Sequence, residues 1–318
     1  MKKLLLMVSA LSAGLFSVAQ ADVTVSGSGG IGLASGQGAY STAVAGAGIT
    51  FGLSSDLGNG VVVSTKGTVS VDSDANDATL TDGIGGFHTF TIATGGSSVS
   101  IGQDIDVAGD GVGEVGSVGS DLNDLGGYGT GSVGAGFADE DGFGFGFTTA
   151  LGAATVTASY VLDNASPLNS SASNLTTTAS GIQASMPMGA MTLTAGMGQD
   201  DTAGAVGGTH TGLELSMALG GGTLTAGTFS TDLNSTGVDK RGYGAKFATT
   251  LGGASVSVGY RYRDDTTNNR NSTVTSASVS QSIGAGASVF VDAVNYSGYT
   301  TASSDTGTNI AVGTTFTF

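Results

Sequence analysis

The stretch Ser255-Val256-Ser257-Val258-Gly259-Tyr260-Arg261-Tyr262-Arg263 decides the fold expected for this chain. Valine and tyrosine occupy every second position, and serine, glycine and arginine occupy the positions between them. In a β-strand, a period of two places these two sets of side chains on opposite faces. The stretch therefore predicts a strand with one apolar face and one polar, partly charged face.

The same alternation recurs along the chain in short segments that turn signals separate. Short and long connections between these segments alternate. Outer-membrane barrels have this pattern, because their periplasmic turns are short and their extracellular loops are longer. We expect strands at 22–34, 42–53, 61–71, 87–93, 98–103, 143–147, 155–162, 177–186, 191–199, 211–218, 223–230, 242–249, 255–263, 273–281, 287–296 and 308–318.

The distribution of apolar residues favours a barrel in a membrane. After residue 21 no apolar run approaches the roughly 18 residues of a membrane helix. Charges within the expected strands mostly avoid the apolar face, which suits a lipid-facing exterior around a polar lumen. The fold class we predict is all-β, a 16-stranded antiparallel transmembrane β-barrel with a long inward-folded loop after the fifth strand. Strands eleven and fifteen break the alternation, so we expect bulges or shifted boundaries there.

The first 21 residues have the features of a secretory signal peptide. Lys2 and Lys3 precede an apolar run, Leu4 to Val18, and Ala19-Gln20-Ala21 resembles a cleavage site. We expect residues 1–21 to be removed and residues 22–318 to form a single barrel domain. Removal leaves 7 of the 9 basic residues against 25 acidic ones, a net charge of about −18. Such a surplus of acid argues against nucleic acid as a partner.

A long acidic stretch, residues 103–141, interrupts the array of strands. It is rich in glycine and contains no Lys or Arg. Loops of this length are usually functional or disordered. We expect it to fold into the lumen as a constriction loop; the alternative is an unconstrained acidic surface loop. The candidate carboxylates on the loop side of the pore are Asp104, Asp106, Asp110, Glu114, Asp121 and Asp124.

Basic residues are candidates for the opposite side of the constriction. Six of the seven basic residues after the signal lie between Lys240 and Arg270. In a closed ring of sixteen strands, the thirteenth strand lies opposite the base of the acidic loop. The wall-side candidates are Lys66, Lys246, Arg261 and Arg263. Because carboxylates outnumber bases, we expect a weak preference for cations. For the two arginines, the alternative is a loop-end salt bridge with Asp264 and Asp265.

The remaining chemistry-bearing residues give weaker signals. The run Asp72-Ser73-Asp74-Ala75-Asn76-Asp77 begins like a calcium loop but lacks the expected glycine and closing glutamate, so we treat a structural calcium ion as a secondary possibility and expect no other cofactor. His88 and His210, the two histidines, have no metal-ligand spacing. We predict no catalytic residues and no enzyme activity.

Three short motifs carry a resemblance to a known family. These are Asp22-Val23-Thr24-Val25-Ser26-Gly27, Ser100-Ile101-Gly102-Gln103 and the terminal Thr315-Phe316-Thr317-Phe318. In their order and spacing the chain resembles the general bacterial porins, most closely those of photosynthetic alphaproteobacteria. It departs from enterobacterial porins because the acidic loop lacks a Pro-Glu-Phe-Gly-Gly type motif.

The resemblance implies a homotrimer in the outer membrane of a Gram-negative bacterium, in contact with membrane lipid and lipopolysaccharide. It also implies that residues 72–86 lean on a neighbouring subunit. The function it implies is a water-filled channel for passive diffusion of ions and small hydrophilic solutes. The alternative function is that of a secreted or surface-displayed Gly/Asp-rich β structural or adhesion protein. Regular nine-residue repeats would favour this alternative, and the sequence contains none.

Overall fold

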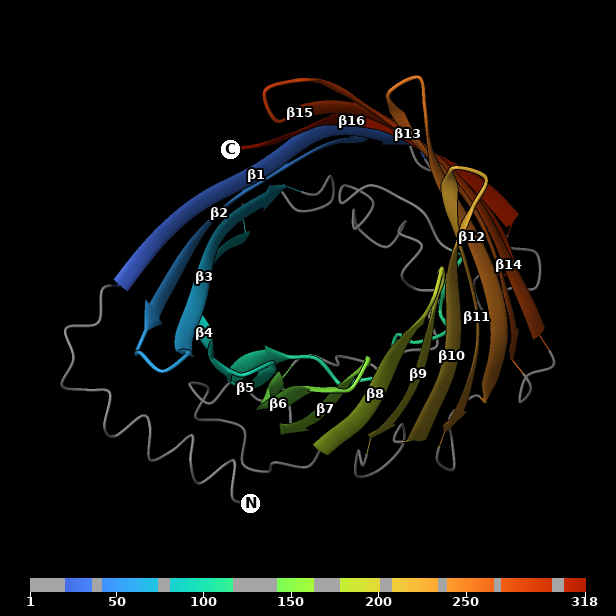
Figure 1. Ribbon diagram of the computed structural model, residues 1–318. Helices are drawn as coiled ribbons and strands as arrows, with labels where there is room; N and C mark the ends of the chain where they lie inside the picture. The colour runs from blue at the N-terminus through green and yellow to red at the C-terminus, as the bar shows by residue number, and fades with distance from the viewer. Residues whose placement is uncertain are drawn as a thin grey trace.

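The computed structural model describes residues 21–35, 42–73, 81–116, 142–162, 178–200, 208–233, 239–265, 270–298 and 306–318. These residues form sixteen antiparallel strands that close into one barrel (Figure 1). The predicted fold class is confirmed. The strands are β1 Ala21–Ser35, β2 Thr42–Asp56, β3 Val61–Ser73, β4 Thr81–Thr94, β5 Ser97–Ile105, β6 Gly142–Leu151, β7 Ala154–Leu162, β8 Thr178–Met188, β9 Met191–Asp200, β10 Gly208–Leu219, β11 Gly222–Leu233, β12 Lys240–Leu251, β13 Ala254–Asp265, β14 Arg270–Gly284, β15 Ala287–Ser297 and β16 Thr306–Thr317.

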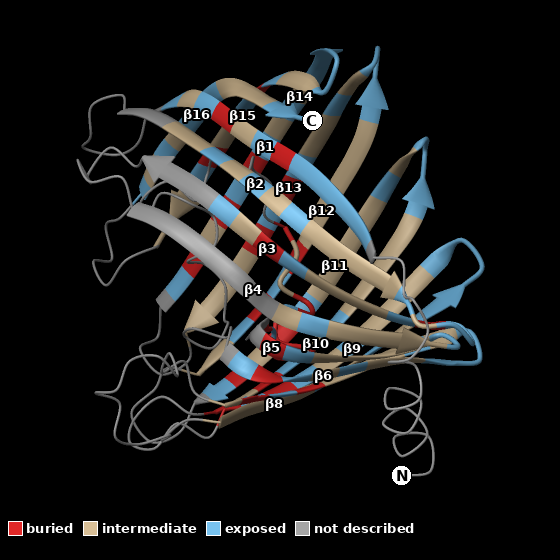
Figure 2. Ribbon diagram, turned by 90° about the vertical axis from the view of Figure 1, so that its left-hand side faces the viewer, coloured by how far each residue is buried: buried red, intermediate tan, exposed pale blue. Residues whose placement is uncertain are grey.

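The outer face of the barrel is apolar, as the alternation predicted. Val258 on β13 is 49% exposed and Phe145 on β6 is 46% exposed, so neither packs into a central core. Residues that are directly opposite on paired strands share a face, and Val258 pairs with Phe247 on β12 and Ala277 on β14. Exposed and partly exposed residues therefore cover most of the barrel wall, and buried residues occur in patches (Figure 2).

The bulges expected in β11 and β15 are absent from both strands, whereas the expected boundary shift is present in β11, which ends at Leu233 and not at position 230. Both pair in unbroken register with the strands that follow them. The alternation is irregular because Phe229 and Phe290 face the lumen, where they are 3% and 4% exposed. Register shifts occur in other places, opposite Gly67 of β3 and at Ile283 of β14.

Strand β4 begins at Thr81, six residues earlier than the alternation indicated. The added part, which contains three glycines, pairs with the end of β3 from Asp72 to Thr68. Pairing with a neighbouring strand thus extends a segment whose own sequence shows no alternation.

The two-residue connections all lie between an even-numbered strand and the strand that follows it. Between β10 and β11, Gly220 and Gly221 form a two-residue turn with φ angles of +57° and +83°. Positive φ at both positions is the requirement of a type I′ hairpin turn, which glycine meets without strain. The alternation of short and long connections is therefore present in the structure, with the short turns on one rim.

The barrel closes where β1 pairs with β16, from Ser28 opposite Thr317 to Ser35 opposite Ile310. Two backbone hydrogen bonds join Gly27 and Phe318, at 2.9 and 3.0 Å. Among the described residues, no helix is long and apolar enough to cross a membrane. The expected signal peptide lies outside the described residues up to position 20.

Candidate functional site

The first part of the acidic loop, residues 105–116, lies against the inner wall of the barrel. It leaves the end of β5 and passes along the inner, lumenal side of strands β8 to β12 (Figure 1). Among the described residues, side-chain hydrogen bonds attach it to four different strands, β7, β10, β13 and β14. Ser159 on β7 accepts from the Ala108 amide at 2.6 Å, and Ser276 on β14 donates to the Gly116 carbonyl at 3.2 Å. The inward fold of the loop therefore holds for residues 105–116; residues 117–141 lie outside the described residues.

The other two attachments come from larger side chains. His210 on β10 is 0% exposed, and its Nε2 lies 3.2 Å from the Val112 carbonyl oxygen. Since a carbonyl only accepts, this bond requires a proton on Nε2. Nδ1 lies 3.1 Å from the Thr231 hydroxyl, and the ring stacks on Phe229 at 6.0 Å. Arg261 donates from Nε to the Val115 carbonyl at 3.3 Å.

Apolar side chains of the loop face the wall. Val107, Ala108 and Val112 are 3–7% exposed, and Ile105 and Val107 form a cluster with Val161 of β7. Burial of a valine side chain contributes roughly 1.5–3 kcal/mol relative to exposure. The loop is thus held by apolar burial as well as by hydrogen bonds.

The predicted acidic residues have different environments. Asp106 is exposed, Glu114 is half-buried and Asp110 is 4% exposed. The Oδ1 of Asp110 is buried without a hydrogen-bond partner. The side chain of Asp104 and the whole of Asp121 and Asp124 lie outside the described residues.

The structure brings two of the predicted bases next to the loop. Arg261 is 5% exposed, and Arg263 lies two residues further along the same face of β13. The Glu114 carboxylate acts electrostatically on Arg261 and also on Lys240, at the start of β12. Lys240 was not among the predicted site residues. The result is a cluster of three bases and one carboxylate at the level of the loop and above it, toward the rim that carries the long loops.

The other two predicted bases lie elsewhere in the lumen. Lys246 on β12 lies on the turn-bearing side of the loop, where it acts electrostatically on Glu214 of β10. Lys66 on β3 belongs to the opposite wall of the ring. Arg261 contacts the constriction loop and not a loop-end aspartate, which was the alternative for this residue. Asp264 and Asp265 lie opposite Arg241 and Lys240 in the β12–β13 register.

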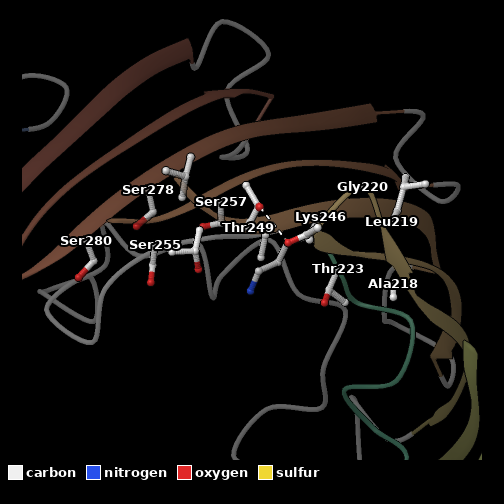
Figure 3. Close-up of a pocket in the computed structure, with 15 residues that line it drawn as sticks. Ala218, Leu219, Gly220, Thr223, Lys246, Thr249, Ser255, Ser257, Ser278 and Ser280 are labelled. Carbon is white, nitrogen blue, oxygen red and sulfur yellow. Dashed lines mark hydrogen bonds between the residues drawn. The ribbon is translucent and has the colours of Figure 1, made fainter. Parts of the chain in front are cut away.

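A recess of about 750 Å³ surrounds Lys246 on the turn-bearing side of the loop. Among the described residues that line it, Lys246 alone is charged, and the other polar groups are mainly hydroxyls. Figure 3 shows the lysine and the serines of β13 and β14 pointing to the same side of the wall, which is the lumenal side. The labelled serines are Ser255, Ser257, Ser278 and Ser280.

The geometry is that of a hollow barrel with a polar, charged lumen and an apolar outer face. Residues 6–309 match the sequence profile of the Gram-negative porins. The chain belongs to this family. The porin is therefore an outer-membrane diffusion channel of a Gram-negative bacterium, and its fold and family are those of a channel rather than an enzyme.

Solved structures of porins have the same fold. The anion-selective porin from Comamonas acidovorans is 14% identical, with a TM-score of 0.69 over 94% of this chain and 100% of that chain. The trimer form of OmpT from Vibrio cholerae is 13% identical, with a TM-score of 0.69 over 94% and 99%. A mutant of the Rh. blastica porin is 17% identical, with a TM-score of 0.66 over 93% and 100%. A comparison with curated protein sequences finds no match.

Metal binding has no support in the described part of the porin. Within it, no three carboxylate or histidine side chains come close enough together to hold a metal ion. The calcium candidate falls on residues 72–77, of which 74–77 lie outside the described residues and the side chains of 72 and 73 are not described.

Proposed function

We propose that this porin passes ions and small hydrophilic solutes by passive diffusion, with a weak preference for cations. The observation that carries the proposal is the attachment of residues 105–116 to the lumenal wall, which brings acidic loop residues into the channel. The chain has 25 acidic residues against 9 basic ones, so the mean field on a permeating ion favours positive charge. At physiological salt a Debye length of about 8 Å confines that field to the neighbourhood of the loop.

Anion preference is the competing function, and a specific observation favours it. Lys240, Lys246, Arg261 and Arg263 all lie on the lumenal face of β12 and β13. The solved porin of Comamonas acidovorans, with the same fold, is anion-selective by its description. The proposal therefore requires that the acidic residues outweigh these four bases in their effect on a permeating ion.

A reversal-potential measurement separates the two functions. The purified porin is inserted into a planar bilayer that separates two concentrations of potassium chloride. Cation preference gives a potential that is positive on the dilute side, because potassium crosses faster than chloride. A potential of the opposite sign would contradict the proposed cation preference. The absence of conductance would contradict the channel function itself.

We further propose that the protein is a homotrimer that contacts lipid and lipopolysaccharide through its apolar exterior, after removal of residues 1–21. The apolar exterior of the barrel supports lipid contact, and the OmpT relative is described as a trimer form. We also propose that this porin is related to the porins of photosynthetic alphaproteobacteria. The basis is the three motifs at 22–27, 100–103 and 315–318. Conductance steps in groups of three, together with a heat-sensitive oligomer on gels, are expected. A stable species with the mass of one chain would contradict the trimer.

A further inference from the structure

The loop lies on a row of glycines, one on each of six consecutive strands. In each case the glycine faces the lumen and a Cβ atom added to it would meet the backbone of the loop or come within 2.6–2.8 Å of it. At Gly212 the obstacle is the carbonyl oxygen of Val112, and at Gly244 it is the carbonyl oxygen of Val115. We call these six residues the glycine row: Gly181, Gly196, Gly212, Gly227, Gly244 and Gly259.

The row runs around the barrel at one level. Gly196 lies directly opposite Gly212, and Gly227 lies directly opposite Gly244. Between Gly212 and Gly227 the row shifts by two residues toward the turn-bearing rim, and the same shift occurs between Gly181 and Gly196 and between Gly244 and Gly259. Tilted strands make a path of directly opposite residues climb toward the other rim, and this repeated shift offsets the climb. A loop that runs along the inner wall at one level therefore meets a glycine on every strand from β8 to β13.

Serines mark both ends of the row. Ser159 on β7 is directly opposite Gly181, and Ser276 on β14 is directly opposite Gly259. These are the two hydroxyls that hydrogen-bond the loop at Ala108 and Gly116. The wall residues are thus glycines where the loop backbone passes over them. At the two ends of this passage they are serines, which hydrogen-bond the loop.

The loop itself has glycines that match the row. At Gly109 and Gly113, φ is +89° and +88°, and an added Cβ would overlap or crowd the backbone of β8 to β11. An added Cβ on Gly196 would lie 2.6 Å from the Gly109 Cα, and one on Gly227 would lie 2.8 Å from the Gly113 Cα. Real Cβ atoms do not approach so closely, so both surfaces are glycine by steric necessity at these contacts.

We propose that the glycine row sets how far the constriction loop projects into the channel, so that its members are positioning residues for size selection. The inference rests on the proposed function, because it concerns the passage of solutes through the same lumen. Contact between the two backbones is the closest approach that a loop can make to a barrel wall. A methyl group at any position of the row would overlap or crowd the loop backbone, and the loop would have to move away from the wall toward the channel axis.

A pair of wall variants tests the proposal. Gly212→Ala places a methyl group against the Val112 carbonyl. The matched control is Gly146→Ala on β6, also lumen-facing, whose added Cβ has Ser100 Cβ at 3.6 Å as its nearest atom, an ordinary contact. Single-channel conductance and the entry of neutral sugars of increasing size into liposomes are measured. The expected result is lower conductance and a lower size limit for Gly212→Ala, with the control equal to wild type.

A pair of loop variants serves if Gly212→Ala does not reach the folded, heat-modifiable form, because these changes leave every strand intact. Gly113→Ala meets the Thr228 carbonyl of β11, whereas Gly111→Ala has no atom within 4 Å. Gly113→Ala is expected to shift conductance and Gly111→Ala is not. Folded Gly212→Ala and Gly113→Ala channels with wild-type conductance and size limit would overturn the inference. Wild-type protein without conductance would instead overturn the channel function.

Discussion

A charge placed on the outer face of β13 tests whether that face contacts lipid. The perturbation is Val258→Arg, at a side chain that is 49% exposed on the outer wall. A strand that rises about 3.4 Å per residue at a tilt near 40° gains roughly 2.6 Å of height per residue. Val258 is the fifth residue of β13, so it lies about 12 Å above the turn. That height is close to the midplane of an apolar band about 25 Å tall.

At the midplane an arginine costs about 2–4 kcal/mol, and near the interface the cost falls to about 0–1 kcal/mol. Two controls follow from the structure. Leu251→Arg keeps the outward direction but lies beside the Gly252-Gly253 turn at the rim, and Ser257→Arg lies next to Val258 but faces the lumen. We expect a loss of 2–4 kcal/mol for Val258→Arg and less than about 1 kcal/mol for each control.

The assay is reversible urea unfolding of the porin in lipid vesicles. The chain has no tryptophan, so the folded fraction is read from migration on unheated gels rather than from indole fluorescence. Equal losses for Val258→Arg and Leu251→Arg would refute the depth argument. A loss for Ser257→Arg as large as that for Val258→Arg would refute the assignment of the two faces.

Two further predictions concern the lumen and its contact with the loop. Phe229→Ala removes a buried ring that stacks on His210, and we expect a loss of about 3–5 kcal/mol in the same unfolding assay; a loss below 1 kcal/mol would contradict the packing described. Arg261→Gln removes a positive charge beside Glu114, and we expect the cation-to-anion permeability ratio from reversal potentials to rise about twofold at physiological salt. An unchanged or lower ratio would show that the Arg261 charge does not act on permeating ions.

The strands could be predicted because a half-buried strand shows its period directly. The expected range 255–263 lies inside the observed Ala254–Asp265, and the short turns fall where glycines cluster. The inward rings of Phe229 and Phe290 could not be predicted by parity. The inward ring of Phe229 stacks on His210, a contact between strands that the period of one strand does not reveal.

The path of the loop was predicted only in its direction. Charge favoured an inward fold, but the contacts that hold residues 105–116 are mainly backbone atoms, apolar side chains and glycines. One signal in the sequence could have indicated where on the wall the loop lies. From position 181 to 259 the row recurs at intervals of 15 to 17 residues, always on the face that parity assigns to the lumen. His210 gave no such signal, because a lone histidine in a strand has no partner that sequence spacing can identify.

The seam between β1 and β16 has a consequence for biogenesis. β1 pairs with β2 and β16 pairs with β15, but the pairing of β1 with β16 has to wait until the whole barrel sequence is present. Until then both are open edges that can recruit other chains. The separation along the chain between these partners is nearly the full length of the molecule, which makes the final ring closure a slow, late event.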